Sequence, residues 1–344
     1  MSENSFKVEA VTGRVSAVSK NNFRVGTVFA ILFATLILTV AFPDSPVQMV
    51  NDNSMFVAFI FLLMIIYGAK LYFNHKKIVS NTDIFLILSS GLFLWELLIG
   101  KFALFDPFLF PGPAKVFLVF QIDTKQMVDG IISSLSILLA GYSIALIFAI
   151  PIGLYAGWKK RVFDVAYPIA KTVSPIPATV YLPYSIVLLP TFKASSIFLI
   201  FIGAFWPILV GSVYGVFSAD SRLINSARTL GLSDYQMIRK ILLPAALPSI
   251  FSGAMIALIL SFITLTVAEM VAATSGLGWY IQYYHLFANY DKVVAGMILM
   301  ILIVIGIMNI FDRVQKYFLC WHPLYGKEEG PDESFVGEIP ASSL

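Results

Sequence analysis

Two charged side chains, Lys171 and Glu269, fall within or at the end of long apolar stretches of this sequence. Ionisable groups are costly in lipid, so residues of this kind are candidates for function. Lys171 precedes the break made by Pro175 and Pro177, where a cavity can present a cation to an anion; reaching the membrane interface is the alternative. Glu269 precedes a glycine-rich turn, which favours a structural hydrogen bond over proton transfer. We take Lys171, Pro175, Pro177 and Glu269 as candidate pathway or gate residues.

The residue patterns of common catalytic and metal sites are missing from the sequence. No Gly-x-x-x-x-Gly-Lys-Ser/Thr motif occurs, so the chain has no P-loop for ATP phosphates, and no nucleophile elbow occurs. The single cysteine, Cys320, excludes a disulfide within one chain, and three widely separated histidines form no metal pattern: His75, His285 and His322. We therefore expect no catalytic activity, no metal and no cofactor in this chain.

The composition is that of a membrane protein. Of the 344 residues, 58% are hydrophobic and only 12% are charged, and the mean hydropathy is +0.85. A soluble domain is much less apolar. We expect an all-α integral membrane fold of about eight transmembrane helices.

Apolar stretches near the length that crosses a bilayer define these eight spans. Their approximate ranges are 25–42, 55–73, 84–100, 130–156, 162–190, 195–217, 250–273 and 293–311. The fifth is interrupted at Ser174-Pro175-Ile176-Pro177, so we expect it as two helical pieces. Polar segments precede and follow the spans at residues 1–24 and 322–344.

The distribution of lysine and arginine predicts the orientation of the spans. With an inner amino terminus, the inner segments hold seventeen of these residues and the outer segments five, with Lys171 inside a span. Basic residues are retained on the cytoplasmic side. Both termini and the segment 218–248 are therefore expected in the cytoplasm, in a multi-pass protein of a prokaryotic plasma membrane.

The segment 218–248 lies between the sixth and seventh spans. Its capping residues, glycine and prolines predict a helix, a turn and a second helix. Asp220 or Ser221 can cap the first helix, and Gly231 suits a left-handed residue at its end. Ser233 with Gln236 has the form of a capping box, and Pro244 and Pro248 are expected to stop the second helix. Two helices this short need a lipid surface or a partner protein.

The spacing in this segment resembles the cytoplasmic loop of binding-protein-dependent ABC importer permeases. Their signature is Glu-Ala-Ala, three residues, Gly, nine residues, then Ile, any residue and Leu-Pro. This chain has Asn225-Ser226-Ala227, then Gly231, then Ile241 to Pro244 at the same intervals. The surrounding sequence is most similar to the nitrate, sulfonate and taurine branch of that family. An amphipathic element on anionic headgroups is the alternative that this spacing disfavours.

The resemblance implies that this segment couples the permease to a cytoplasmic ATPase. The implied contact residues are Asn225, Ser226, Ala227, Arg228, Gly231, Ile241, Leu243 and Pro244. Asn225 stands where the family has Glu, so it offers only neutral hydrogen bonds. Coupling would then depend more on Arg228 and on nearby leucines.

The resemblance also divides the chain. It covers about Leu94 to Trp321, and the family core usually has six spans. We therefore assign residues 83–321 to an ABC permease transmembrane domain of type I, and residues 25–82 to an additional two-helix hairpin. This hairpin either packs on the core or binds a partner.

By this resemblance, the chain is a permease subunit of an ATP-driven importer for a small solute, with nitrate, sulfonates and taurine as the expected anions. The implied partners are ABC ATPase subunits that bind ATP and Mg, a second permease copy, an extracytoplasmic binding protein and lipid, but no nucleic acid. A thiamine-precursor-like or other small organic solute is an alternative cargo.

A secondary carrier driven by an ion gradient is the alternative from another class. Such carriers commonly show intramembrane carboxylates or internal repeats, whereas this chain has only Glu96 and Glu269 near span ends and no evident repeat. A membrane enzyme, a third class, lacks a constellation of catalytic residues.

Overall fold

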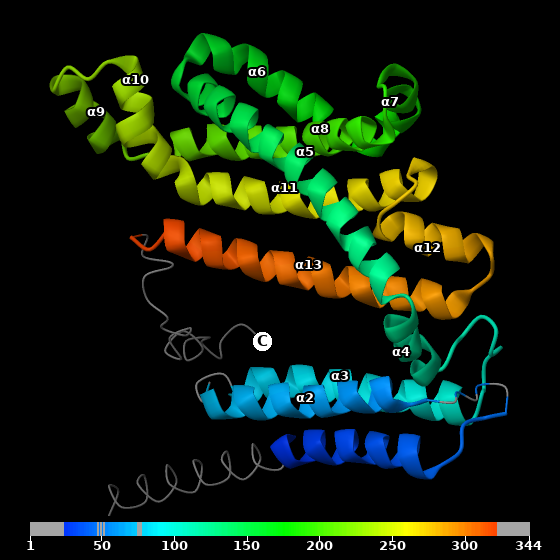
Figure 1. Ribbon diagram of the computed structural model, residues 1–344. Helices are drawn as coiled ribbons and strands as arrows, with labels where there is room; N and C mark the ends of the chain where they lie inside the picture. Colours follow the sequence, from blue (N-terminus) through cyan, green and yellow to red (C-terminus); the bar gives the residue numbers. More distant parts are fainter. Residues whose placement is uncertain (1–23, 47, 49, 51, 74–77, 322–344) are drawn as a thin grey trace, which may run out of the picture. The chain divides into compact units, whose positions relative to one another are not determined.

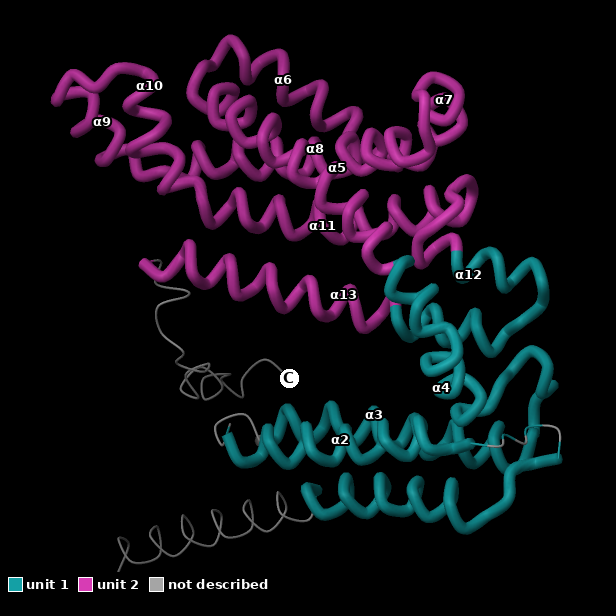
Figure 2. Tube along the Cα trace, in the orientation of Figure 1, with its two compact units in different colours: residues 1–130, 280–299 teal, residues 131–279, 300–344 magenta. Residues whose placement is uncertain are grey.

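The computed structural model describes residues 24–46, 48, 50, 52–73 and 78–321. Within these residues the chain is all helical, with no strand (Figure 1). It divides into two compact units, residues 1–130 with 280–299 and residues 131–279 with 300–344 (Figure 2). The predicted segments 1–24 and 322–344 fall almost wholly outside the described residues.

The first unit contains the additional hairpin. Its helices are Arg24–Ala41, α2 (Ser54–Phe73), α3 (Ile78–Trp95), the π-helical η2 (Glu96–Lys101) and α4 (Pro113–Ile122). Large apolar side chains from all of the α-helices form one buried cluster, including Leu32, Phe56, Tyr67, Phe85 and Phe117. The hairpin therefore packs on α3 and α4, which is one of the two roles the sequence left open.

The second unit contains the remaining spans and the polar segment. Its helices are α5 (Thr124–Trp158), α6 (Lys160–Val173), the 3₁₀ turn η3 (Ala178–Tyr181), α7 (Leu182–Leu188), α8 (Phe192–Phe217), α9 (Ser221–Thr229), α10 (Asp234–Met237), the π-helical η4 (Ile238–Leu242) and α11 (Leu243–Ala272). Three helices, α5, α12 (Leu277–Leu286) and α13 (Tyr290–Phe318), begin in one unit and end in the other.

Helices α8 and α11 pack together through small residues. A Cβ atom added at Gly211 would lie 2.8 Å from the carbonyl oxygen of Ser249, and one added at Gly253 would lie 2.6 Å from that of Pro207. Since lipid gives helices no hydrophobic reason to associate, close backbone approach of this kind is what stabilises helix pairs in membranes. Both helices flank the polar segment, so this packing fixes its two ends.

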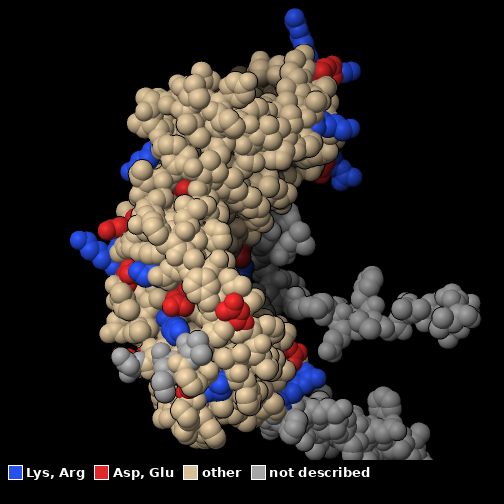
Figure 3. All heavy atoms as spheres, turned by 90° about the vertical axis from the view of Figure 1, so that its right-hand side faces the viewer, with Lys and Arg blue, Asp and Glu red and all other residues tan. Residues whose placement is uncertain are grey.

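Seven helices in the described part of the chain are long and apolar enough to cross a membrane. They correspond to every predicted span except the fifth, which the structure divides into α6, η3 and α7. The predicted break at Pro175 and Pro177 is therefore confirmed. Lys, Arg, Asp and Glu are absent from much of the surface in Figure 3, as expected for a protein covered by lipid.

The sequence prediction was wrong about Pro244 and Pro248, which do not stop the second helix. The π-helical turn η4 leads directly into α11, where Pro244 occupies the first turn and Pro248 lies inside the helix. The wide π-helical turn immediately before Pro244 accommodates a residue that has no backbone N–H to donate, so the helix runs on through it. The second half of the polar segment is thus continuous with the span α11.

Candidate functional site: the polar loop

We call Ser218–Pro248 the polar loop. The Asp220 carboxylate caps α9 by accepting a hydrogen bond from the backbone N–H of Arg222, at 2.8 Å. Gly231 has a φ of +69°, and the backbone N–H of Leu232 donates to the carbonyl of Ala227, which closes the end of the helix. These contacts confirm the predicted first helix and its glycine turn.

The second helix begins with a complete capping box. The Ser233 hydroxyl accepts from the backbone N–H of Gln236, and the Gln236 side chain accepts from the backbone N–H of Ser233 at 3.0 Å. This reciprocal pair satisfies two backbone donors that a helix start otherwise leaves unpaired. The prediction from the spacing of Ser233 and Gln236 is confirmed.

The polar loop is anchored by a small apolar cluster at the end of α5, α8 and α11. Ala227 from α9, Met237 from α10 and Leu242 from η4 are buried against Leu154 of α5 and Val216 of α8. The two short helices therefore bury one side against the spans. They are therefore in contact with all three spans.

A second anchor links the polar loop to the end of α5 through polar contacts. The Trp158 indole donates to one carboxylate oxygen of Asp234 at 2.8 Å, and the Lys159 ammonium donates to the other at 2.6 Å. The Arg228 guanidinium lies over the Trp158 ring, 5.2 Å from its centroid. Both α9 and α10 are thus held by Trp158, the last residue of α5, and by Lys159, which follows it, a contact that the sequence analysis missed.

We expect Asp234→Asn to loosen this anchor and to raise the rate of tryptic cleavage after Arg228, Arg239 or Lys240 by roughly twofold, because exposed ion pairs are weak. The measurement is limited proteolysis of the full chain in detergent, with Asp164→Asn on α6 as a control for loss of an exposed carboxylate. Equal cleavage rates in the wild type and Asp234→Asn would show that the contact with α5 does not restrain the loop.

The side of the polar loop that faces away from the spans is partly apolar. Leu223, Leu230 and Tyr235 are 54%, 79% and 68% exposed. Basic residues accompany them, namely Arg222, Arg228, Arg239 and Lys240, all exposed. Asn225 and Ser226 of α9 are also exposed, whereas Ala227 is buried. The predicted loop residues are therefore brought together, some as surface and some as anchor.

Glu269 lies at the other end of α11, in a buried hydrogen-bond node. Its carboxylate accepts from the Ser134 hydroxyl at 2.6 Å and from the backbone N–H of Gly278 at 2.8 Å. The backbone N–H of Leu277 in turn donates to the Ser134 hydroxyl at 2.9 Å. The node joins α5 and α11 to the start of α12. Its contacts are structural hydrogen bonds, which the sequence favoured over proton transfer for Glu269.

The candidate residues Lys171, Pro175 and Pro177 lie together at the break between α6 and α7. Lys171 is exposed in the last turn of α6, and the two prolines flank Ile176 before η3. A cavity of about 170 Å³ lies there, lined by this break and by residues of α8 and α11 that include Trp206 and Thr264. Glu269 is not among its lining residues.

Comparisons with known proteins place this geometry in a family. Residues 149–319, from the end of α5 to the end of α13, match the family model described as the inner membrane component of binding-protein-dependent transport systems. A protein of Methanocaldococcus jannaschii that is named an ABC transporter permease protein is 31% identical over 259 residues, which are 71% of this chain and 94% of that protein. The chain belongs to the ABC transporter permease family.

Other relatives of this permease have more specific names. The taurine transport system permease protein of Escherichia coli is 32% identical over 55% of this chain and 69% of its own length. A nitrate import permease protein of Synechocystis is 33% identical over 53% of this chain and 65% of its own length. These names confirm the resemblance to the nitrate, sulfonate and taurine branch, since taurine is itself a sulfonate.

A solved structure confirms the fold of the permease. One chain of the MetNI methionine ABC transporter, in an inward-facing conformation, aligns with a TM-score of 0.52 and 22% identity, over 58% of this chain and 98% of that chain. The match covers little more than half of the permease. The type I ABC permease fold is therefore shown, and the chain carries further helices beside it.

The first unit of the permease contains a polar network that the sequence analysis also missed. Asp123, at the end of α4, accepts from the Tyr280 hydroxyl at 2.8 Å and pairs with the Lys292 ammonium at 2.7 Å. Burial, and after it the hydrogen bond to Asp123, raises the pKa of Tyr280, so its hydroxyl remains a donor. The network thus fixes the Tyr280 ring at the start of α12 through a buried acid.

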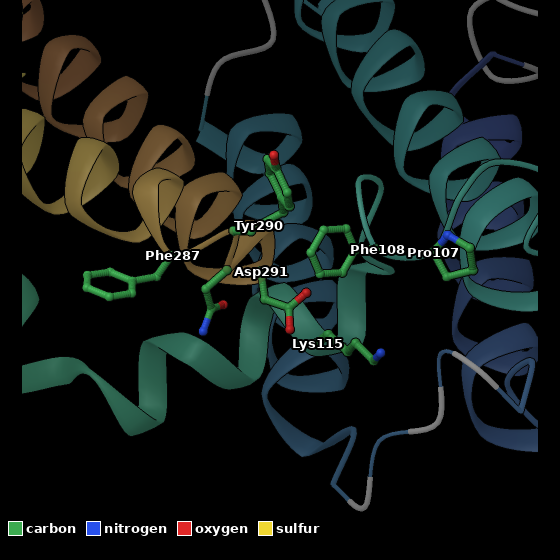
Figure 4. Close-up of a pocket in the computed structure, with 8 residues that line it drawn as sticks. Pro107, Phe108, Lys115, Phe287, Tyr290 and Asp291 are labelled. Atoms are coloured by element: carbon green, nitrogen blue, oxygen red, sulfur yellow. The ribbon is translucent and has the colours of Figure 1, made fainter.

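A hollow in the same unit opens between the 107–108 segment, α4 and the α12–α13 turn (Figure 4). It has a volume of about 430 Å³, with Phe108, Phe287 and Tyr290 as aromatic lining and Lys115 and Asp291 as charged lining. Ala288 in the turn has a φ of +54°. The hollow belongs entirely to the first unit and contains none of the predicted site residues.

Proposed function

We propose that the polar loop is the docking surface for a separate ABC ATPase, and that the permease forms the pathway for a small anion such as nitrate, a sulfonate or taurine. The observation that carries the proposal is the exposed apolar side of a well-capped loop. An amphipathic helix pair normally buries its apolar residues. Here Leu223, Leu230 and Tyr235 are left open while Ala227 and Met237 anchor the loop.

The proposal assigns a role to each half of the polar loop. At α9, the exposed Leu223 and the C-cap residue Leu230 supply apolar contact, Asn225 and Ser226 supply neutral hydrogen bonds, and Arg222 and Arg228 supply charge. Because Asn225 cannot form an ion pair, charge complementarity with the ATPase rests on arginine and lysine. Ile241 and Leu243 belong to the anchor at η4 and α11, where they transmit movement rather than contact the ATPase, and the exposed Pro244 lies beside them.

The proposed mechanism follows from the anchors. Movement of a docked ATPase on ATP binding would displace α9 and α10, and through the buried cluster and the Asp234 contacts it would tilt α5, α8 and α11 together. ATP and Mg would be held by the ATPase, since this chain has no P-loop. The proposed gate lies at Lys171, Pro175, Pro177 and Glu269, where the spans are interrupted or end. Interrupted helices in membranes are typical of such sites.

Further partners and the orientation belong to the same proposal. We infer that a second copy of the permease completes the pathway, that an extracytoplasmic binding protein delivers the anion, and that the polar loop and both termini face the cytoplasm of a prokaryote. The excess of basic residues on the loop side supports this orientation. The permease itself performs no catalysis in this account.

The proposal is tested by Leu230→Glu, which places a charge at the centre of the exposed apolar side. We expect that the full-length variant, purified from its native membranes, carries at least tenfold less co-purified ATPase than the wild type does. The ATPase is identified by its P-loop peptides. The readout is quantitative mass spectrometry of the co-purified protein. Buried apolar anchors dominate the affinity of protein interfaces, which is why one charge has so large an effect.

The matched control is Tyr317→Glu. Tyr317 is 77% exposed in the last turn of α13, at the same end of the second unit as α9 and α10 (Figure 1). It should leave the amount of ATPase unchanged. An equal loss in both variants, or retention of the ATPase by Leu230→Glu, would contradict docking on the polar loop.

A further inference from the structure

A second hollow lies on the membrane-spanning part of the second unit, and its lining is rich in hydroxyl groups. Its volume is about 500 Å³, and it is bounded by the end of α6, by α8 and by α11. The hydroxyl-bearing residues that line it are Ser174, Tyr214, Ser249 and Ser252. The volume is within the range of about 300–1,000 Å³ that is usual for small-molecule sites.

Several of these hydroxyls have hydrogen-bonding capacity to spare. Within the described part of the chain, the hydroxyls of Ser174 and Ser249 have no hydrogen-bond partner. The Tyr214 hydroxyl lies 2.9 Å from that of Tyr167. Since each hydroxyl has one hydrogen, this pair uses one hydrogen internally and leaves the other for an outside acceptor. The hollow therefore has hydroxyl donors that an outside acceptor can use.

One cation lies at the edge of this hollow. Lys171 is exposed, and it lies one helical turn after Tyr167 and one turn before Ser174, so it projects from the same side of α6 as both. Among the described residues no carboxylate forms an ion pair with it. Lys171 belongs to a polar stripe of α6 that includes Lys160 and Asp164 and borders the side on which Phe163 and Tyr167 pack against the core. A stripe of this kind is not suited to lipid tails, and it indicates a surface in contact with water.

We propose that this hollow is an anion-binding site within the pathway, in which Lys171 supplies the counter-charge and the hydroxyls of Ser174, Ser249 and the Tyr167–Tyr214 pair donate to the oxygens of a small monovalent oxyanion or sulfonate. An ammonium group with several hydroxyl donors forms charge-assisted hydrogen bonds to such an anion. The inference rests on the proposed function in that the bound anion is the cargo.

The test is binding of radiolabelled taurine to the full-length permease in lipid nanodiscs at low salt, with nitrate, ethanesulfonate and ethylammonium as competitors. We expect nitrate and ethanesulfonate to compete and ethylammonium not to. Lys171→Gln should weaken binding at least tenfold, and Lys171→Arg should restore most of it. Lys160→Gln, on the same polar stripe of α6, should bind taurine as the wild type does.

Three results would overturn the inference: no saturable taurine binding by the wild type, equal binding by Lys171→Gln, or an equal loss in Lys160→Gln, which would indicate only diffuse charge. The ATPase content of the same Lys171→Gln preparations separates this inference from the proposed function. Normal ATPase content with no anion binding would refute the site alone. Anion binding with no ATPase in the wild type would refute docking on the polar loop alone.

Discussion

Gly231→Pro is expected to abolish co-purification of the ATPase while leaving the permease in the membrane. Gly231 has a φ of +69°, and the proline ring fixes φ near −65°. Proline would also remove the hydrogen bond that the Gly231 N–H donates to the carbonyl of Arg228 at 3.0 Å. The turn between α9 and α10 therefore cannot form, and the exposed leucines lose their arrangement. The spans on either side do not depend on this turn.

Gly231→Asn is the matched control for this prediction. An added side chain has room, because no atom lies within 4 Å of a Cβ at this position. Asparagine tolerates the left-handed conformation better than other residues with a side chain, so ATPase binding should stay within about threefold of the wild type. The measurement is the ratio of ATPase to permease in purified complexes. An unchanged ratio in Gly231→Pro would exclude the folded turn from docking.

The second large effect is expected at Gly276, next to the Glu269 node. Gly276 has a φ of +122°, and an added Cβ would overlap the carboxylate of Glu269. Gly276→Ala should therefore strain the backbone by about 1–3 kcal/mol and displace a buried acid from Ser134 and Gly278. We expect the apparent Tm of the purified permease to fall by roughly 5 °C or more, with a loss of transport.

Gly306→Ala in α13 controls for the change from glycine to alanine itself. No atom lies within 4 Å of a Cβ at Gly306, and alanine favours helix, so the Tm should stay equal or rise slightly. Thermal unfolding of the two variants, followed by size-exclusion chromatography after heating, gives the comparison. A Tm for Gly276→Ala that equals the wild-type value would mean that the node at Glu269 does not hold α11 and α12 in place.

The local structure of the polar loop could be predicted because local rules determine it. The cap at Asp220, the left-handed Gly231 and the capping box of Ser233 each depend on residues within three positions of one another. The same rules were wrong at Pro244. The wide π-helical turn before Pro244 lets the helix continue, and no residue pattern in the sequence predicts that turn.

The contacts that connect the polar loop and the gate to the spans could not be predicted from one sequence. Asp234 meets Lys159 across 75 positions, and Ser134 meets Glu269 across 135. Serine and aspartate are too common for such pairs to be recognised without the fold. The sequence also predicted the fifth span as crossing the membrane in two pieces, but the strong polar stripe of α6 became evident only once its packing side was known.

The most direct test of docking is photo-crosslinking from the polar loop in native membranes, with p-benzoylphenylalanine in place of Leu230 in the full-length permease. Our account predicts one dominant crosslinked product, whose partner gives peptides of a P-loop ATPase and whose yield falls when Gly231→Pro is added. Crosslinks only to lipid, or only within the permease itself, would contradict it, because the exposed side of the loop would then have another occupant.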